Sequence, residues 1–256
     1  MKRKRQRKRV TMALMYSDPG IFEPMFSDDD LVFDVGACIG AFTEWLLSRG
    51  ARVVSVEPEK RDVEELRARF GDNENVTIIP KALGEKPGTG MLSINSAART
   101  ISTFVPQEFW GIGSAFRGTT ATQTEEVEIT TLDALIAEYG RPRFVKIDVE
   151  GYEAWVLRGL SQPIPYVQFE VCCVTFAHGR VQECFDRILA LAPGAQFNYT
   201  VDESNAFECY EPGEDRFAVW KPAGVVLRAI EKHIGEWPLF WGNAFARMEV
   251  GDGEPD

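Results

Sequence analysis

The sequence predicts an α/β fold in which a mostly parallel central sheet carries helices on both faces. Short apolar runs, bounded by glycine, proline or acidic residues, have the length of buried strands. Segments with apolar side chains at helical spacing separate these runs, and strands that alternate with helices form parallel sheets. A chain of 256 residues with 45% hydrophobic residues suits one such domain.

The first helix is predicted over 41–49, where Phe42, Trp45 and Leu46 fall on one stripe before Gly50. The stretch 84–126 interrupts this rhythm because it is rich in Gly, Ser and Thr, so we expect it to be an insertion. The other predicted elements are a helix carrying Val63, Leu66 and Phe70, helices near 132–139, 151–160 and 181–189, and strands at 31–35, 53–56, 76–79, 91–95, 127–130, 144–149, 166–171, 196–200, 217–220 and 244–248.

Charge is distributed unevenly along the chain. Seven Lys or Arg lie within residues 2–9, and the remaining sequence has 21 basic against 39 acidic residues, a net charge of −18. An acidic body disfavours a nucleic-acid groove. We expect residues 1–30 to be a basic, disordered tail and lead-in, and 31–250 to be the domain. The alternative for the basic run is a tether with weak contact to RNA, a membrane surface or an import receptor.

Cysteine and histidine usage indicates a reducing environment and no metal site. The five cysteines are an odd number without a C-x-x-C pair, which argues against a disulfide framework and a zinc site. Two histidines are too few for a histidine cluster. No stretch approaches the ~20 apolar residues of a membrane span. We therefore expect a cytoplasmic protein without a membrane span.

The segment from Leu31 to Pro58 predicts a nucleoside-binding βαβ unit. Gly36 and Gly40 leave room for a ligand to approach backbone N–H groups at the helix start. Glu57 follows Gly36 by 21 residues and is placed to accept hydrogen bonds from ribose hydroxyls. The spacing is G-x-x-x-G and lacks the extra glycine that a pyrophosphate needs. This favours S-adenosylmethionine (SAM), which has no phosphate, over a dinucleotide.

Five of the predicted strands, at 31–35, 53–56, 76–79, 144–149 and 166–171, alternate with helices, and carboxylates stand at the carboxyl ends of four of them, where open α/β sheets bind ligands. They are Asp34, Glu57, Asp148 with Glu150, and Glu170; the remaining strand is followed by Lys81 and Ala82. A hydroxyl acceptor needs a proton acceptor during attack. Asp148 is the first candidate for this base and Glu170 the second, with Glu150 and His178 as further candidates. Asp148 and Glu170 holding a divalent ion is a weaker alternative.

The run Phe144-Val-Lys-Ile-Asp-Val-Glu-Gly-Tyr-Glu153 resembles the signature of the FkbM-type SAM-dependent methyltransferases. The stretches Asp34–Ala37, Thr130–Ile136, Gln168–Glu170 and Trp241–Arg247 also resemble that family, so the similarity covers about 31–248. The resemblance implies a Rossmann-like class I methyltransferase fold, a SAM cofactor and O-methylation of a sugar, glycan or secondary metabolite.

The resemblance also implies roles for individual residues. Asp34, Gly36, Ala37 and Gly40 would surround the methionine part of SAM, Glu57 would hold the ribose, Lys81 and Ala82 would lie near the adenine, and Asp148 would line the reaction centre.

Two departures from the family pattern keep a second reading open. Cys38 stands where the family often has Asn, and Asn243 where an Asp is expected. A methyltransferase fold that has lost turnover and acts as a binding protein is therefore one alternative. An NAD-dependent oxidoreductase is another, and the missing middle glycine counts against it.

Overall fold

The computed structural model describes residues 20–22, 24–95, 102–105, 123–172, 179–201, 208–216, 218–236 and 241–249. The basic run 2–9, the central part of the insertion and His178 lie outside these residues. Within them, no helix is both long and apolar enough to cross a membrane.

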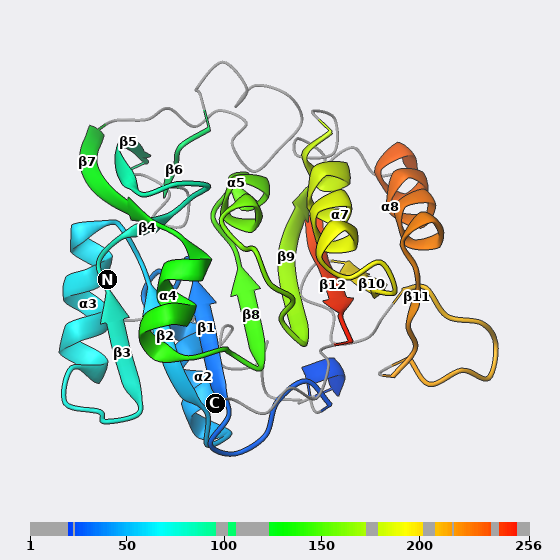
Figure 1. Ribbon diagram of the computed structural model, residues 1–256, viewed down its shortest axis with the longest axis horizontal. Coiled ribbons are helices and arrows are strands. Elements are labelled where there is room, and N and C mark those ends of the chain that lie inside the picture. The colour runs from blue at the N-terminus through cyan, green and yellow to red at the C-terminus, as the bar shows by residue number, and fades with distance from the viewer. Residues whose placement is uncertain are drawn as a thin grey trace, which may run out of the picture.

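The centre of the protein is an eight-stranded sheet in the order β11-β10-β12-β9-β8-β1-β2-β3 (Figure 1). The neighbouring strands β3, β2, β1, β8 and β9 pair in parallel, whereas β12 runs antiparallel to both β9 and β10. The bounds are β1 Leu31–Val35, β2 Arg52–Val56, β3 Val76–Ile79, β8 Phe144–Ile147, β9 Tyr166–Cys172, β10 Gln196–Val201, β11 Lys221–Pro222 and β12 Trp241–Arg247. The predicted mostly parallel α/β fold is confirmed.

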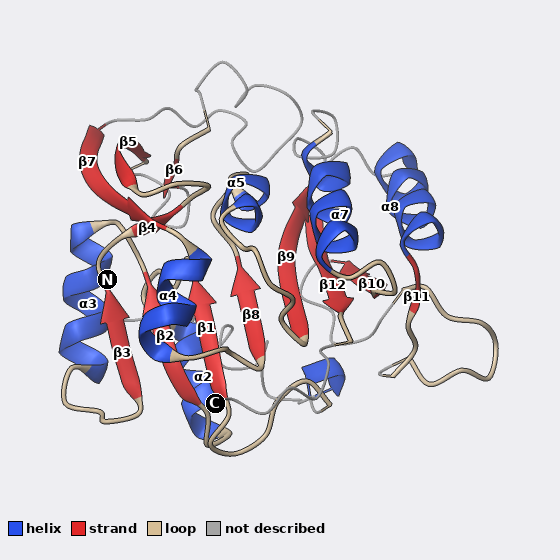
Figure 2. Ribbon diagram, in the orientation of Figure 1, coloured by secondary structure: helices blue, strands red, loops and turns tan. Residues whose placement is uncertain are grey.

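Helices cover both faces of this sheet (Figure 2). One face packs against α4, α5, α7 and α8, and its core is rich in Val, Leu and Ile, with Phe169, Phe185 and Phe197 fully buried. The other face carries α2 and α3 together with the short 3₁₀ turn η1. The bounds are η1 Gly20–Phe22, α2 Ala41–Ser48, α3 Lys60–Phe70, α4 Leu132–Tyr139, α5 Glu153–Arg158, α7 Arg180–Leu191 and α8 Ala223–Glu236.

The core begins before the first strand. Ile21, Phe22, Met25 and Phe26 are buried, and the Phe22 ring lies 5.1 Å from that of Trp45 and 5.9 Å from that of Phe144. Four clustered aromatic and aliphatic side chains of this kind bury enough apolar surface to fix the segment against the sheet. The end of the predicted lead-in is therefore part of the packed structure.

The insertion contains a second, smaller sheet above the carboxyl ends of the main strands (Figure 1). Its strand order is β4-β7-β5-β6. The antiparallel pair of β5 and β7 matches the strands predicted near 91–95 and 127–130, and β4 and β6 add two residues each. The bounds are β4 Ala82–Leu83, β5 Gly88–Ile94, β6 Ser102–Thr103 and β7 Gln123–Thr130.

The region after β10 differs from the prediction. The strand predicted at 217–220 is wrong, because residues 218–220 form no strand and Phe217 lies outside the described residues. Trp220 instead packs against the Tyr166 ring at 6.0 Å, and the Val219 carbonyl accepts a hydrogen bond from the buried Asn198 amide. The sequence analysis also missed α8, which buries Val226 and Ile230 against the sheet.

Candidate active site

A cavity opens at the topological switch point of the sheet, between β1 and β8. From β1 the chain continues outward to β2 and β3 on one side, and from β8 it continues outward to β9 on the other side. Open α/β sheets bind their ligands at such a point. The cavity measures about 1000 Å³, including space open to solvent. The carboxyl ends of β1, β2 and β8 form its base, and β4, β5 and β6 of the small sheet contribute to its wall.

The glycine turn after β1 is shaped by the neighbouring strand. Gly36 has a φ of 78°, and a Cβ there would lie 1.8 Å from the Asp148 carbonyl oxygen. Its N–H group and that of Ala37 both donate to the Val56 carbonyl. The Gly40 N–H donates to the Ala37 carbonyl. These three N–H groups are therefore bonded within the protein, and the approach of a ligand to the N–H groups at the helix start stays a prediction.

Packing against α3 explains why position 40 is a glycine. Gly40 shares the φ of 78°, but a Cβ there would meet the Phe70 and Leu66 side chains of α3 and not the cavity. Cys38, between the two glycines, also has a left-handed φ of 49°. Asn adopts this region more readily than most residues, which gives a backbone reason for Asn at this position in the family.

Glu57 stands at the end of β2 with its carboxylate fixed by the backbone. One oxygen accepts the Cys38 N–H at 2.9 Å and the other accepts the Glu59 N–H at 2.8 Å. The side chain is nearly inaccessible, and this burial raises the pKa of Glu57 to about 8. Each carboxylate oxygen can accept more than one hydrogen bond, so Glu57 keeps acceptor capacity toward the cavity that it lines.

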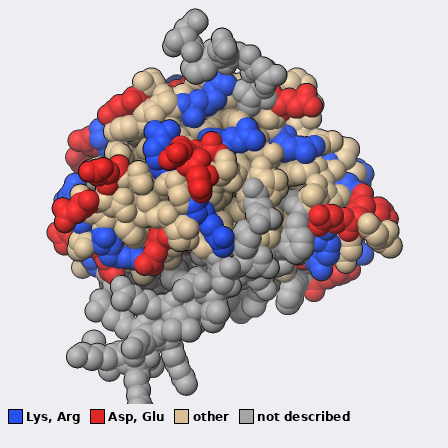
Figure 3. Space-filling model, turned by 90° about the horizontal axis from the view of Figure 1, so that it is seen from below, with Lys and Arg blue, Asp and Glu red and all other residues tan. Residues whose placement is uncertain are grey.

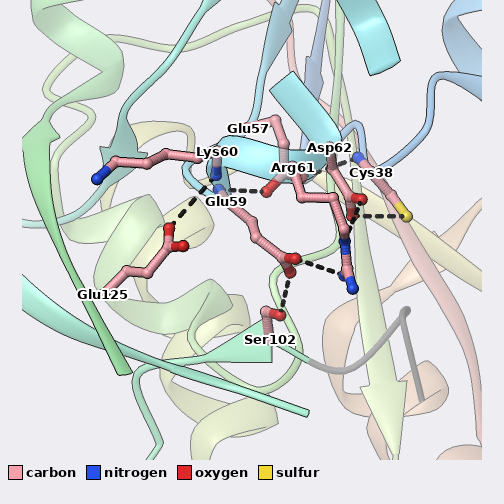
Figure 4. A network of polar contacts seen from close by, with 8 residues as sticks. All are labelled: Cys38, Glu57, Glu59, Lys60, Arg61, Asp62, Ser102 and Glu125. Atoms are coloured by element: carbon pink, nitrogen blue, oxygen red, sulfur yellow. Dashed lines mark hydrogen bonds and ion pairs between the residues drawn. The ribbon is translucent and has the colours of Figure 1, made fainter. Parts of the chain in front are cut away.

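A polar network joins Glu57 to the small sheet (Figure 4). Ser102 of β6 donates to Glu59 Oε2 at 2.7 Å, and Glu59 also contacts the Arg61 guanidinium. The Cys38 thiol lies 3.7 Å from Asp62 Oδ2, and the Lys60 N–H donates to Glu125 of β7 at 3.4 Å. The network ties the start of α3 to both the glycine turn and the small sheet.

Lys146 is a buried cation beneath the cavity. It lies in register beside Asp34 on the adjacent strand, with Nζ 3.8 Å from Asp34 Oδ1 and 3.0 Å from Asp148 Oδ2. Asp34 is fully buried and accepts a hydrogen bond from Thr43 at 2.7 Å. Burial raises the pKa of Asp34, and the Lys146 charge opposes that shift. Lys146 therefore links a carboxylate below the cavity to one that lines it.

The turn after β8 concentrates acidic side chains. Glu153 is buried, and its Oε1 accepts the Val149 and Gly151 N–H groups at 3.1 and 3.0 Å. Burial raises the pKa of Glu153 to about 7. Glu150 is half-buried and has a left-handed φ of 56°. Partial burial and the neighbouring charge of Glu150 raise the pKa of Glu170, which pairs in register with Asn243 of β12.

The structure brings most of the sequence-predicted site residues to one cavity, but not all. Those that line it are Gly36, Ala37, Glu57, Lys81, Ala82 and Asp148; those that do not are Asp34, Gly40 and Glu170. Glu59, Thr103, Lys146 and Tyr152 line it as well and were missed as site residues. Lys146 could have been predicted from the sequence, because a lysine inside the apolar run of a central strand needs a buried partner.

The cavity is rich in acidic side chains. Its lining holds five Asp or Glu residues against two lysines, and both lysines are ion-paired, Lys81 with Glu128 at 2.9 Å and Lys146 with Asp148. The face at the amino ends of the main strands instead shows both signs of charge interspersed (Figure 3). The described residues include no group of three or more His, Cys, Asp or Glu side chains placed to hold a metal ion. The four described cysteines are free.

The sequence model of the methyltransferase FkbM domain matches residues 34–200, which include the end of β1, the glycine turn, Glu57, Asp148 and Glu170. The chain belongs to this family.

Comparison with individual proteins gives partial matches. The chain is 30% identical over 149 residues to the hexuronic acid methyltransferase AglP of Haloferax volcanii, covering 56% of this chain and 55% of that protein. It is 41% identical over 54 residues to a probable ribosomal RNA small subunit methyltransferase A of Methanococcoides burtonii, covering 21% and 20%. The chain thus spans about half or less of the curated relatives it matches. A precorrin-6y C5,15-methyltransferase structure from Geobacter metallireducens aligns with a TM-score of 0.45 and 10% identity, covering 92% of this chain and 87% of that one.

Proposed function

We propose that this chain is a SAM-dependent methyltransferase that methylates a hydroxyl group of a sugar, glycan or secondary metabolite. Membership of the FkbM methyltransferase family supports the reaction class. The similarity to a hexuronic acid methyltransferase supports a sugar acceptor. The observation that carries the choice of cofactor is the charge of the cavity.

SAM carries a positive sulfonium, whereas NAD⁺ brings a negatively charged pyrophosphate. Five acidic side chains line the cavity, and burial raises the pKa of Glu57 and Glu150 among them. A cationic ligand favours the ionised form of these groups, whereas a pyrophosphate at the same place opposes it. Glu57 fits the ribose, because backbone N–H groups hold its two oxygens and each oxygen can still accept a hydrogen bond from a ribose hydroxyl. Gly36, Ala37, Lys81 and Ala82 line the same cavity and would complete the cofactor site.

Bound SAM supplies a methyl group that is already electrophilic. The protein then has to orient the acceptor in line with that methyl group and exclude water. It must also take the proton from the acceptor hydroxyl. Asp148 lines the cavity at the end of β8, beside the base that we propose below. The wall contributed by the small sheet and by Phe104 would shield the reacting groups.

Calorimetric titration of the purified chain with SAM, S-adenosylhomocysteine and NAD⁺ tests the cofactor. We expect binding of both adenosyl ligands and none of NAD⁺. NAD⁺ binding alone would refute the proposal in favour of an oxidoreductase. Methyl transfer from tritiated SAM to p-nitrophenyl glycosides of neutral hexoses, hexosamines and hexuronic acids tests the acceptor class. A chain that binds SAM but methylates none of them would refute the sugar acceptor.

A further inference from the structure

Two carboxylates line the cavity beyond β8, and the protein holds them differently. Asp148 Oδ2 lies 3.0 Å from the ammonium of Lys146, which is only 5% exposed. Contact of this oxygen with an acceptor hydroxyl would compete with the ion pair. Asp148 is therefore already engaged as the partner of a buried cation.

Glu150 sits in a turn that is fixed from two sides. Its carbonyl oxygen accepts a hydrogen bond from the Thr103 hydroxyl of β6 at 2.7 Å. From the opposite side, Glu153 accepts the N–H groups on either side of Glu150, those of Val149 and Gly151. A left-handed φ at a glutamate is uncommon and persists where the surroundings over-determine it. The turn thus holds Glu150 in the cavity wall in a single backbone conformation.

The electrostatic setting of Glu150 favours proton uptake. Partial burial, followed by the charges of Asp148 and Glu153, raises the pKa of Glu150 well above the usual glutamate range, and Lys146 opposes this effect. A general base works best when its pKa lies near the operating pH. The pKa of Glu170 is also raised, but Glu170 does not line the cavity.

We propose that Glu150, and not Asp148, is the proton acceptor for the acceptor hydroxyl, and that Thr103 is a positioning residue that holds its turn; this rests on the methyl transfer proposed above. As the acceptor oxygen forms its bond to the methyl carbon, the bond between that carbon and the donor sulfur breaks and its electron pair stays on sulfur. The hydroxyl proton passes to a Glu150 carboxylate oxygen and is later released to water. Asp148 and Lys146 remain paired throughout.

The test compares the full chain with E150Q, T103V and T103S, and with E231Q as a matched control on the exposed surface of α8. Methyl transfer to the p-nitrophenyl glycosides should fall roughly 10²–10⁴-fold in kcat for E150Q, the range typical of a lost general base. SAM binding and a cooperative unfolding transition should both be retained. T103V should lower kcat without raising the KM for SAM, T103S should restore it, and E231Q should match the parent.

A second readout needs no turnover. In chains carrying glutamate labelled with ¹³C at the side-chain carboxyl, the resonance that E150Q removes should titrate above those of the exposed glutamates. T103V should displace this midpoint, and T103S should return it. A Glu150 resonance that titrates with the exposed glutamates overturns the assignment. So does an E150Q variant that keeps the parent kcat and pH profile, or one that loses SAM binding. A parent that binds no SAM refutes the proposed function itself.

Discussion

Gly36 and Gly40 form a matched pair for testing how the glycine turn is built. Both have a φ of 78°, so alanine imposes the same backbone strain at each position, about 1–2 kcal/mol. They differ in what the added methyl group meets. At Gly40 it meets Phe70 Cε2 at 2.5 Å and Leu66 Cδ2 at 2.7 Å, which are the ends of side chains. At Gly36 it meets the Asp148 backbone oxygen at 1.8 Å.

These contacts set the expected loss of stability. Overpacking a core costs typically about 1–3 kcal/mol when side chains can shift, so G40A should lower the free energy of unfolding by about 2–5 kcal/mol. No rotamer change relieves the contact at Gly36, because the oxygen belongs to the backbone and the two residues directly follow the paired strands β1 and β8. Strands β1 and β8 must move apart, so G36A should lose about 5 kcal/mol or more, in the range that is exceptional for point mutations.

Guanidinium unfolding followed by tryptophan fluorescence measures both losses, and calorimetry measures SAM affinity. Because Gly40 does not line the cavity, G40A should retain SAM binding at concentrations where it is folded, whereas G36A should lose it. G88A is the control, since a Cβ at Gly88 meets nothing within 4 Å. Equal midpoints for G36A and G40A, or loss of SAM binding by a folded G40A, would show that this reasoning is wrong.

Three further predictions concern other parts of the cavity and the fold. The pKa of Glu57 is about 8 in the unliganded chain, and hydrogen bonds from the ribose hydroxyls need the ionised carboxylate. SAM affinity should therefore rise with pH from about 6 to about 8 and level off above about 8. Calorimetry at several pH values should show this slope for the parent and not for E57Q. C38N should raise the free energy of unfolding by up to about 1 kcal/mol, since Asn adopts the left-handed φ at lower cost, and a lower urea midpoint would contradict this. N198L should lower it by about 2–4 kcal/mol, because the buried Asn198 side chain makes four hydrogen bonds to backbone groups, and a midpoint near that of the parent would argue against their contribution.

The central sheet was predictable because its strands are buried on both faces. Runs such as Leu31–Val35 and Phe144–Ile147 are apolar apart from Asp34 and Lys146, and helices with one apolar stripe separate them. The region after β10 lacks such a signal. Phe217–Trp220 has strand-like residues, but tertiary contacts of Trp220 decide its conformation. The antiparallel insertion of β12 between β9 and β10 depends on long-range pairing that no local pattern encodes.

The site was predictable where one strand end determines it, as at Glu57 and Asp148. It was not predictable where residues distant in sequence meet. Ser102 and Thr103 are two small polar residues in a Gly- and Ser-rich stretch, and only the folded small sheet brings them to Glu59 and Glu150. The packing of Gly40 was not predictable for a related reason, because the spacing of two glycines does not reveal that one of them faces a neighbouring helix.

The two-residue strand β6 has a consequence for how binding events communicate. Ser102 holds Glu59 on the side of the ribose carboxylate, and Thr103 holds the turn that carries Glu150. Adjacent residues of one strand therefore contact both halves of the cavity. A ligand in either half that shifts this strand changes the free energy of binding in the other half, and by thermodynamic necessity the effect is equal in both directions. Cofactor and acceptor affinities should accordingly be reciprocally coupled, and loss of either hydroxyl should weaken that coupling more than it weakens either affinity alone.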